Sequence, residues 1–421
     1  YICAKPARRR ANGEGAAMTD SDDRRVLIAG AGPAGCVAAL ILARAGIEVT
    51  LFEAEPELPT DLRASTFHPP TLDMLAELGL ADRLVEQGLI APTYQFRDRR
   101  SGDAATFDLS VLEGTTGYPF RLQCEQFKLT REAVADLEAE PRATILFGRA
   151  AAAVAQDEAG VTLTVDGPEG EEVHRGAFLI GADGASSAVR RACGVAFDGF
   201  TYPEQWVVAS TPFDFAEAIP NLSPVTYVAD PEDWFVLLRT RELWRVLIPV
   251  EADADHDRIL SDDFLEETLQ GIAAKPAPYE IRHRTIYRVH QRVAESYRKG
   301  RVALAGDAAH INNPLGGMGM NGGVHDAVNL AGKLVLILKE RADADAMLDH
   351  YAAQRRAIAE EYVLAHTHQN KQAIEEKDPA ARRAHLEELQ AVAADREKLL
   401  AHVRKGAMLD AVEKSMALSP A

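Results

Sequence analysis

The chain has 421 residues, of which 47% are hydrophobic and 26% are charged. These proportions exclude a disordered chain, a collagen-like fibre and a disulfide-stabilised miniprotein. Acidic residues outnumber basic ones by 64 to 46, and the resulting net charge of −18 argues against nucleic acids and anionic membranes as partners.

The four cysteines lie far apart in the chain and form no C-x-x-C pair. We therefore predict neither a disulfide framework nor a zinc site, and no metal. Reduced thiols of this kind are typical of a cytoplasmic protein.

Residues 1–17 carry four basic residues against one acidic residue, with no apolar segment that would indicate a secretory signal. We expect a non-native or disordered leader here, with the chain proper starting at Met18. An Arg-rich transit peptide is the alternative.

The first predicted elements form a βαβ unit. Residues 26–29 are an apolar run typical of a buried parallel strand, 34–45 predict a helix, and 47–52 predict a second strand. Residues 26–43 carry no charge, but their glycines and proline fit a βα unit better than a membrane span, so no transmembrane helix is predicted.

Further elements follow in chain order. Helices are predicted over 72–78, 81–87, 126–139 and 320–339, and strands over 144–147, 161–165, 177–180 and 302–305. Residues 201–290 hold all three tryptophans and several strand-like runs, which predicts a mostly antiparallel sheet.

Residues 343–418 predict helices, one of them capped by Asp378 before a proline. An apolar stripe runs along this segment and either packs on the chain's own core or contacts a second copy in a dimer. The stripe consists of Leu386, Leu389, Ala393, Leu400 and Val403.

A G-x-G-x-x-G motif follows the first strand. Gly30 permits a tight turn, Gly32 lets the backbone approach a pyrophosphate, and Gly35 lets the helix pack against the strand. Glu53 ends the second strand, where a carboxylate binds a ribose hydroxyl. Together they predict a dinucleotide site at the helix N-terminus.

Two further turns follow predicted strands. Asp183 and Gly184 form the first, which is either a ligand site or an ordinary Asp-Gly turn. Gly306 and Asp307 form the second, and a glycine-rich loop from Pro314 leads from it into the long helix. The second turn predicts a carboxylate at the ligand-binding edge of the sheet. The loop and the helix N-terminus suit a flat ligand with negative charge.

The three motifs, in this order and at these separations, resemble those of the single-component FAD-dependent aromatic hydroxylases, the para-hydroxybenzoate hydroxylase-like flavoprotein monooxygenases. The resemblance covers about residues 26–365. It implies an α/β fold in which a Rossmann-like FAD-binding domain is interleaved with a mostly antiparallel β-sheet substrate domain, followed by C-terminal helices.

On this resemblance we assign residues to domains. The FAD-binding domain takes 18–95, 115–195 and 285–365, and the substrate domain takes 96–114 and 196–284. Residues 366–421 form the C-terminal helical segment.

The resemblance also implies the FAD site. Glu53 and the first motif would bind the ADP half, Asp307 the ribityl or ribose side, and the loop from Pro314 the isoalloxazine ring. Arg63 matches an arginine near the diphosphate, and Gln123 a glutamine that contacts the ribityl chain. The implied cofactor-binding residues are Gly30, Gly32, Pro33, Ala34, Gly35, Glu53, Ala54, Arg63, Gln123, Asp183, Gly306, Asp307, Pro314, Gly316, Gly317, Met318, Gly319, Met320 and Asn321.

The implied reaction uses FAD, NAD(P)H and O2. NAD(P)H reduces FAD, reduced flavin and O2 give a C4a-hydroperoxide, and one oxygen is transferred to a phenolic or N-heteroaromatic small molecule. A single G-x-G-x-x-G leaves NAD(P)H without a Rossmann domain of its own, so it would bind transiently. We expect a monomer or homodimer, without nucleic acid or membrane.

The family places substrate contacts on the strand before Pro249. There Arg245 shares a face with Leu243 and Leu247 by the two-residue period, and it binds either a phenolate or carboxylate in the pocket or a surface acid. Tyr227 is either a hydrogen-bond partner of the phenol or a packed tyrosine. The predicted catalytic residues are Arg245, Tyr227 and Pro314, and the predicted substrate residues are Phe235, Leu237, Arg245, Pro314, Leu315 and Gly316.

Three more side chains are considered for the site. We expect His310 to be structural, while His68 and Tyr118 are further pocket candidates.

Two alternatives remain at this point. One is a flavin-dependent halogenase or reductase of the same superfamily, although Leu243–Pro249 matches the halogenase Trp-x-Trp-x-Ile-Pro signature only in part. The other is a non-catalytic flavoprotein that binds an aromatic ligand.

Overall fold

The structure is a computed structural model that describes residues 24–60 and 64–419. The predicted βαβ unit is present, because β1 (Val26–Ala29) pairs in parallel with β2 (Val49–Phe52) and α1 (Pro33–Arg44) connects them. Both strands are buried along their whole length, as a parallel sheet covered on both faces requires. Within the described ranges, no helix is both long enough and apolar enough to span a membrane.

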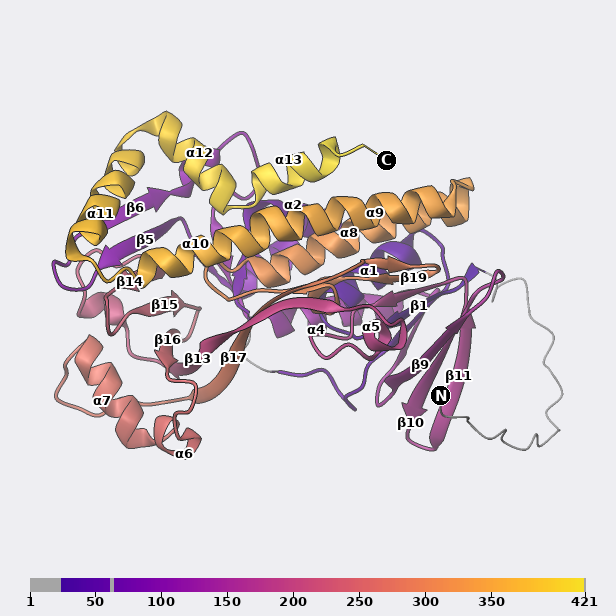
Figure 1. The fold of residues 1–421 in the computed structure, drawn as a ribbon, viewed down its shortest axis with the longest axis horizontal. Helices are drawn as coiled ribbons and strands as arrows, with labels where there is room; N and C mark the ends of the chain where they lie inside the picture. The colour runs from indigo at the N-terminus through magenta and orange to yellow at the C-terminus, as the bar shows by residue number, and fades with distance from the viewer. Residues whose placement is uncertain (1–23, 61–63, 420–421) are drawn as a thin grey trace, which may run out of the picture.

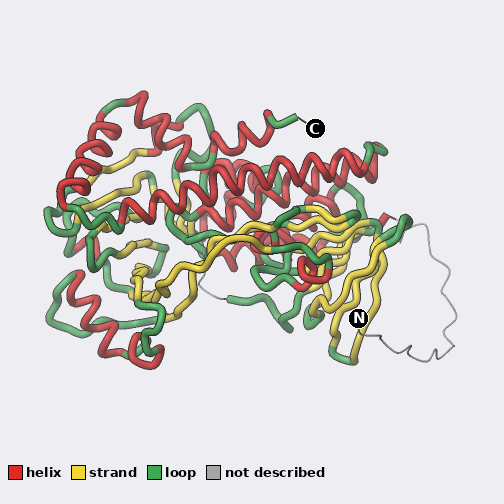
Figure 2. Tube along the Cα trace, viewed as in Figure 1, coloured by secondary structure: helices red, strands yellow, loops and turns green. Residues whose placement is uncertain are grey.

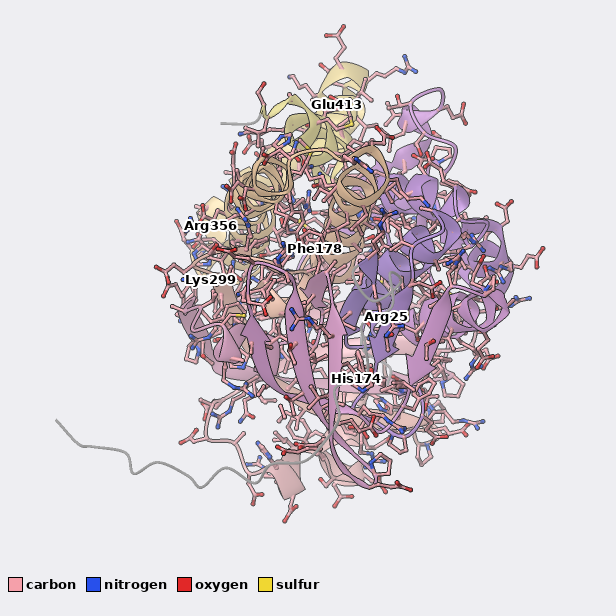
Figure 3. The ribbon with its side chains drawn as sticks, turned by 90° about the vertical axis from the view of Figure 1, so that its right-hand side faces the viewer. Arg25, His174, Phe178, Lys299, Arg356 and Glu413 are labelled. Carbon is pink, nitrogen blue, oxygen red and sulfur yellow. The ribbon has the colours of Figure 1, made fainter. Side chains whose placement is uncertain are left out.

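A six-stranded sheet grows from this unit in the order β18-β19-β12-β1-β2-β8. Its strands are parallel except for the edge strand β18. The strands added to β1 and β2 are β8 (Ala143–Leu146), β12 (Phe178–Gly181), β18 (Arg298–Lys299) and β19 (Val302–Leu304). Strands β1 and β12 begin side by side, since Val26 pairs with Phe178 and the carbonyl of Arg25 accepts from the amide of Ala177. Arg25 and Phe178 are labelled in Figure 3.

The two faces of this sheet are covered by different layers. On one face, α1 packs against α4 (Gln126–Ala139) and α8 (Met318–Glu340). A three-stranded antiparallel sheet contacts β1 and β12, and its apolar side chains join the same core. Its strands are β9 (Ala150–Gln156), β10 (Val161–Gly167) and β11 (Gly170–Gly176).

The eight-stranded sheet, in the order β20-β17-β13-β16-β15-β14-β5-β6, is antiparallel except where β14 meets β5. The antiparallel sheet predicted within 201–290 is therefore confirmed. Its strands are β5 (Thr93–Asp98), β6 (Ala104–Asp108), β13 (Phe197–Thr211), β14 (Val225–Ala229), β15 (Phe235–Arg239), β16 (Trp244–Val250), β17 (His283–Ala294) and β20 (His310–Ile311).

Long strands β13 and β17 pair along most of their length, with a register shift between Thr201 and Gln205, and run from this sheet toward the six-stranded one (Figures 1 and 2). The sheet takes in β5 from Thr93 and β17 through Ala294, so it extends past the boundaries 96 and 284 that we set from the sequence.

Short elements fill the connections. A further three-stranded sheet consists of β3 (Thr66–Phe67), β7 (Arg121–Gln123) and β4 (Leu89–Ala91). The short helices are α2 (Pro69–Ala76), α3 (Ala81–Gln87), α5 (Ala188–Ala192), α6 (His256–Ile259) and α7 (Asp262–Ile272). Helices α6 and α7 lie within 201–290, where we expected strands, and both begin at side-chain caps, Asp255 and Ser261.

The C-terminal segment is helical, as predicted, and Asp378 caps its helix through the amide of Ala380. After a π-helical turn (Ala359–Leu364), the chain folds back over β5 and β6 (Figure 1). Its helices are α9 (Ala344–Ile358), α10 (Ala365–Ile374), α11 (Pro379–Ala394), α12 (Arg396–Gly406) and α13 (Leu409–Ala417).

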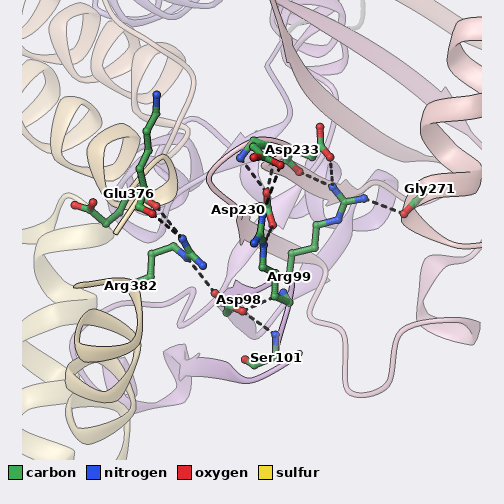
Figure 4. Close-up of polar contacts among 11 residues, drawn as sticks. Asp98, Arg99, Ser101, Asp230, Asp233, Gly271, Glu376 and Arg382 are labelled. Carbon is green, nitrogen blue, oxygen red and sulfur yellow. Dashed lines mark hydrogen bonds and ion pairs between the residues drawn. The ribbon is translucent and has the colours of Figure 1, made fainter. Parts of the chain in front are cut away.

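The apolar stripe of these helices packs on the chain's own core. Leu386 and Val403 join a buried cluster with Tyr94 and Phe107 of the eight-stranded sheet. A largely buried ion pair also links α11 to the eight-stranded sheet. Nε of Arg382 in α11 lies 3.4 Å from the carboxylate of Asp98 in β5 (Figure 4).

Replacing Leu386, which is 6% exposed, should test this packing. We expect Leu386→Ala to lower the free energy of unfolding by about 2–4 kcal/mol, because it leaves a cavity against the sheet. The measurement is urea denaturation, with Glu387→Ala on the exposed face as the matched control. A loss that depended on protein concentration would instead indicate a contact between two copies.

Candidate active site

A cavity of about 670 Å³ lies where the two large sheets meet. The turn after β1, the turn after β19 and the loop before α8 line one part of it. Strands β15, β16 and β17 of the eight-stranded sheet line the other part. The cavity therefore joins the predicted cofactor motifs to the predicted substrate strand.

The first glycine turn has the geometry that the motif predicted. Gly30 has a φ of +98°, and a Cβ there would overlap the carbonyl oxygen of Ala182. A Cβ at Gly35 would overlap the carbonyl oxygen of Gly30. At Gly32, in contrast, a Cβ would meet no atom within 4 Å, and this residue lines the cavity with Pro33. Two of the glycines thus shape the turn, and Gly32 leaves space for a ligand.

Glu53 lies beside this turn, at the end of β2. Its carboxylate accepts hydrogen bonds from the amides of Ala31 at 2.8 Å and Glu55 at 3.1 Å. Both amides belong to the chain's own loops, so the structure shows Glu53 fixing the turn, and its contact with a ribose stays a prediction.

The second turn carries an exposed carboxylate. Gly306 and Asp307 line the cavity after β19, at the carboxyl edge of the parallel sheet. Gly306 has a φ of +60°, and its amide donates to the carboxylate of Asp326 in α8 at 3.0 Å. This contact fixes the direction in which Asp307 leaves the turn.

The loop before α8 is clamped from behind. The amide of Gly316 donates to the hydroxyl of Tyr227 at 3.1 Å, and its carbonyl accepts from Nε2 of His68 at 2.8 Å. Burial holds the pKa of His68 well below its usual range, so the neutral ring carries its proton on Nε2. The side-chain amide of Asn321 donates from Nδ2 to the backbone carbonyls of Thr66 at 2.8 Å and Gly317 at 2.6 Å.

These contacts leave the other side of the loop facing the cavity. Its cavity-lining residues are Pro314, Leu315, Gly317, Met318, Gly319 and Met320. Gly316 and Asn321, which we expected among the ligand contacts, instead hold the loop in place.

The site fits FAD on three observations. The N-terminal amides of α1 and α8 have no side-chain cap, and both helices begin at the cavity. Such amides bind phosphate oxygens and stabilise negative charge. Gly32 leaves room for close backbone approach, and Asp307 offers a carboxylate to ligand hydroxyls. These features suit a dinucleotide whose second half is a flat ring along the loop.

Not every implied cofactor residue reaches the cavity wall. Asp183 accepts from the hydroxyl of Ser187 and the amide of Val189, so its carboxylate caps α5. Gln123 is buried behind Thr66, to which it hydrogen-bonds. Ala54 is exposed away from the cavity, and Arg63 lies outside the described residues.

The predicted face of β16 is confirmed. Arg245 and Leu247 line the cavity, whereas Trp244 packs into the core on the other face. Arg245 is 4% exposed, and its guanidinium donates from Nη1 to the hydroxyl of Ser65 at 3.0 Å. Arg245 was expected either to face the pocket or to pair with a surface acid, and the structure places it in the pocket wall.

The placement of Phe235 and Leu237 in the pocket is wrong. Both pack with Trp244 in the core on the far face of the sheet. The register of β15 against β16 sets Val236 opposite Leu247 and Leu238 opposite Arg245, and these two line the cavity. A one-residue error inverts every side chain of a strand, and sequence alone does not set this register.

Tyr227 lines the cavity, but its hydroxyl accepts from Gly316 and so supports the loop. Tyr118 donates to Asp82 and does not line the cavity. His310 is buried and bonds to Asp326, as expected of a structural histidine.

The sequence analysis missed strand β17, seven residues of which line the cavity. His283, Thr285 and Tyr287 line the cavity on the same face of the sheet as Arg245. Burial raises the pKa of the Tyr287 hydroxyl, and the nearby charge of Arg245 opposes this shift. Their alternate spacing was the available signal, but the boundary that we expect at 285 assigns Thr285 and Tyr287 to the FAD-binding domain and leaves only His283 in the substrate domain.

Comparisons with known proteins show the family of this chain. The family described as "FAD binding domain" matches residues 23–365. Para-nitrophenol 4-monooxygenase of Pseudomonas sp. strain WBC-3 is 36% identical over 85% of this chain and 89% of its own. The 6-hydroxy-3-succinoylpyridine 3-monooxygenase of Pseudomonas putida S16 is 33% identical over 79% and 84%. The crystal structure of p-nitrophenol 4-monooxygenase from Pseudomonas putida DLL-E4 superposes with a TM-score of 0.86 at 32% identity, covering 93% of this chain and 97% of that one.

Two alanine variants of the first turn should separate its roles. We expect Gly32→Ala to leave the stability of the apoprotein unchanged and to weaken FAD binding, because the added methyl occupies only ligand space. Gly35→Ala should lower the free energy of unfolding by about 1–3 kcal/mol or more, because its methyl overlaps backbone. Urea denaturation and titration of flavin fluorescence measure the two effects. Equal effects of both variants on stability would contradict this division.

Proposed function

We propose a substrate for this chain, which belongs to the FAD-binding domain family and is an FAD-dependent aromatic monooxygenase that uses a reduced nicotinamide and O2. The proposed substrate is a single-ring phenol or hydroxylated N-heterocycle. Its ring oxygen substituent binds at Arg245 and Tyr287. One observation carries this proposal. A buried guanidinium and a phenolic hydroxyl lie on the same wall of the substrate end of the cavity.

The relatives support the size and type of substrate. By their names, the two relatives above act on para-nitrophenol and on a hydroxylated pyridine, each a single aromatic ring with one hydroxyl group. Both are monooxygenases by name, so the halogenase, reductase and non-catalytic alternatives are not favoured.

Arg245 suits the ionised form of such a ring. Burial lowers the pKa of Arg245, and the neighbouring Tyr287 and Glu125 oppose this shift. A buried cation stabilises an anion far more than a solvated one does. The phenolate that Arg245 would favour is more electron-rich than the phenol and reacts more readily with an electrophilic oxygen. The chemistry that bound, reduced FAD would supply is the activation of O2, which is the source of that oxygen.

The other walls exclude water. Val236 and Leu238 of β15, Leu247 of β16 and Leu315 of the loop give this end of the cavity an apolar lining. Such walls hold a flat ring against the loop and strengthen the electrostatic contact with Arg245.

The remaining sequence-based assignments belong to the same proposal. They are the division into FAD-binding, substrate and C-terminal segments, the cytoplasmic location, the monomeric or homodimeric state, and the absence of nucleic-acid and membrane partners.

Removing the charge of Arg245 tests the substrate site. We expect Arg245→Met to raise KM for a phenol by about 10- to 100-fold, since a charge-assisted hydrogen bond contributes about 1.5–3 kcal/mol. Tyr287→Phe should raise it by about 2- to 10-fold, because it removes a neutral hydrogen bond. NAD(P)H oxidation in air, with mass detection of the oxygenated product, measures both.

A spectral titration gives an independent readout. Bound para-nitrophenol should ionise at lower pH in the wild type than in Arg245→Met, because the cation favours the phenolate. Arg239→Met is the matched control, since Arg239 of the adjacent strand pairs with Asp214 at 2.8 Å and does not line the cavity. The same ionisation pH in wild type and Arg245→Met would overturn the proposed site.

A further inference from the structure

A buried ion pair lies directly behind the Gly306–Asp307 turn. Asp326 of α8 is fully buried, and its Oδ1 accepts from Nε of Arg355 in α9 at 2.6 Å. Its Oδ2 accepts from Nε2 of His310 at 2.9 Å and from the amide of Gly306 at 3.0 Å. One carboxylate therefore joins the cofactor turn to two long helices.

The pair is charged although it is buried. Burial alone would raise the pKa of Asp326, but Arg355 and His310 outweigh it and hold the pKa below its usual value. Arg355 is 3% exposed, so both charges are out of water. A buried pair of this kind often contributes less to stability than apolar residues of the same size. The carboxylate of Asp326 does more than pair with Arg355, since it also fixes the amide of Gly306.

The same face of α9 is tied to the end of the described chain. Arg355 donates from Nη1 to the hydroxyl of Ser415 in α13 at 3.5 Å. Its neighbour Gln354 donates to the carbonyls of Ser415 at 2.5 Å and Leu418 at 3.2 Å. Helix α13 lies along α9 in Figure 1, and the two are in contact.

A continuous path of polar contacts thus runs from α13 through Arg355 and Asp326 to the turn that presents Asp307. We propose that Asp326 and Arg355 are positioning residues for FAD, and that helix α13 is energetically coupled to the cofactor through them. Because such coupling is reciprocal, FAD binding stabilises the docking of α13 by the same factor by which docked α13 tightens FAD binding.

The first experiment compares FAD affinity among variants of the ion pairs. We expect Asp326→Asn and Arg355→Met to weaken FAD binding by about 10-fold or more, within the range typical of coupled sites. The control is Arg382→Met on α11, which removes another buried arginine, 8% exposed, that pairs with Asp98 (Figure 4). Neither Arg382 nor Asp98 lines the cavity. It should change FAD affinity less than about 2-fold, as expected of an uncoupled site.

FAD affinity is measured by titrating each apoprotein with FAD and following the quenching of flavin fluorescence. The temperature is chosen so that circular dichroism shows every apoprotein to be folded. Folded Asp326→Asn and Arg355→Met proteins with wild-type FAD affinity would overturn the proposal. A loss equal to that of Arg382→Met would also overturn it, since general destabilisation would then explain the effect.

The second experiment needs no variant and therefore does not depend on how the variants fold. Amide hydrogen exchange is followed in the wild-type protein with and without FAD, under conditions where local opening dominates. We expect FAD to slow exchange in α13 (Leu409–Ala417) more than in α11 (Pro379–Ala394), which packs on the eight-stranded sheet. Equal protection of the two helices, or none in α13, would contradict the coupling.

Discussion

The pair of hydrogen bonds to the backbone of Gly316 is the contact on which the site depends. Its amide is bound by Tyr227 of the eight-stranded sheet, and its carbonyl by His68 at the start of α2. The backbone of one residue, through two successive peptide groups, thereby holds the loop between the eight-stranded sheet and the start of α2. Both backbone groups of Gly316 are occupied in this way, and the other residues of the loop between Pro314 and Met320 line the cavity.

Charge within the site differs from the charge of the whole chain. The chain has a formal net charge of −18, yet a buried arginine lies at the substrate end of the cavity and a carboxylate at the cofactor end. In the proposed function, Arg245 would bind an anionic ring oxygen of the substrate and Asp307 would bind hydroxyl groups of FAD. Net charge describes which macromolecules are repelled, and it does not describe recognition inside a cavity of this size.

The C-terminal helices serve the fold in two different ways. Helix α11 covers β5 and β6 through apolar packing and the contact of Arg382 with Asp98. Helix α13 instead lies along α9, close to the buried pair behind the cofactor turn. Segments that are remote in sequence from every cofactor motif are therefore packed directly against the scaffold that orients those motifs.

The sequence by itself determined the parts whose physics is local. Gly30 and Gly35 are required where a Cβ would overlap backbone, uninterrupted apolar runs become strands buried on both faces, and the period of two places Arg245 opposite Trp244. The tertiary structure alone decided what depends on register and on partners remote in the chain. In the structure, Val236 and Leu238 line the cavity, whereas Phe235 and Leu237 do not. The hydroxyl of Tyr227 accepts from the amide of Gly316, and Tyr287 lies in the cavity wall near Arg245. A strand's own pattern gives its two faces, but only pairing with its neighbours decides which face meets the ligand.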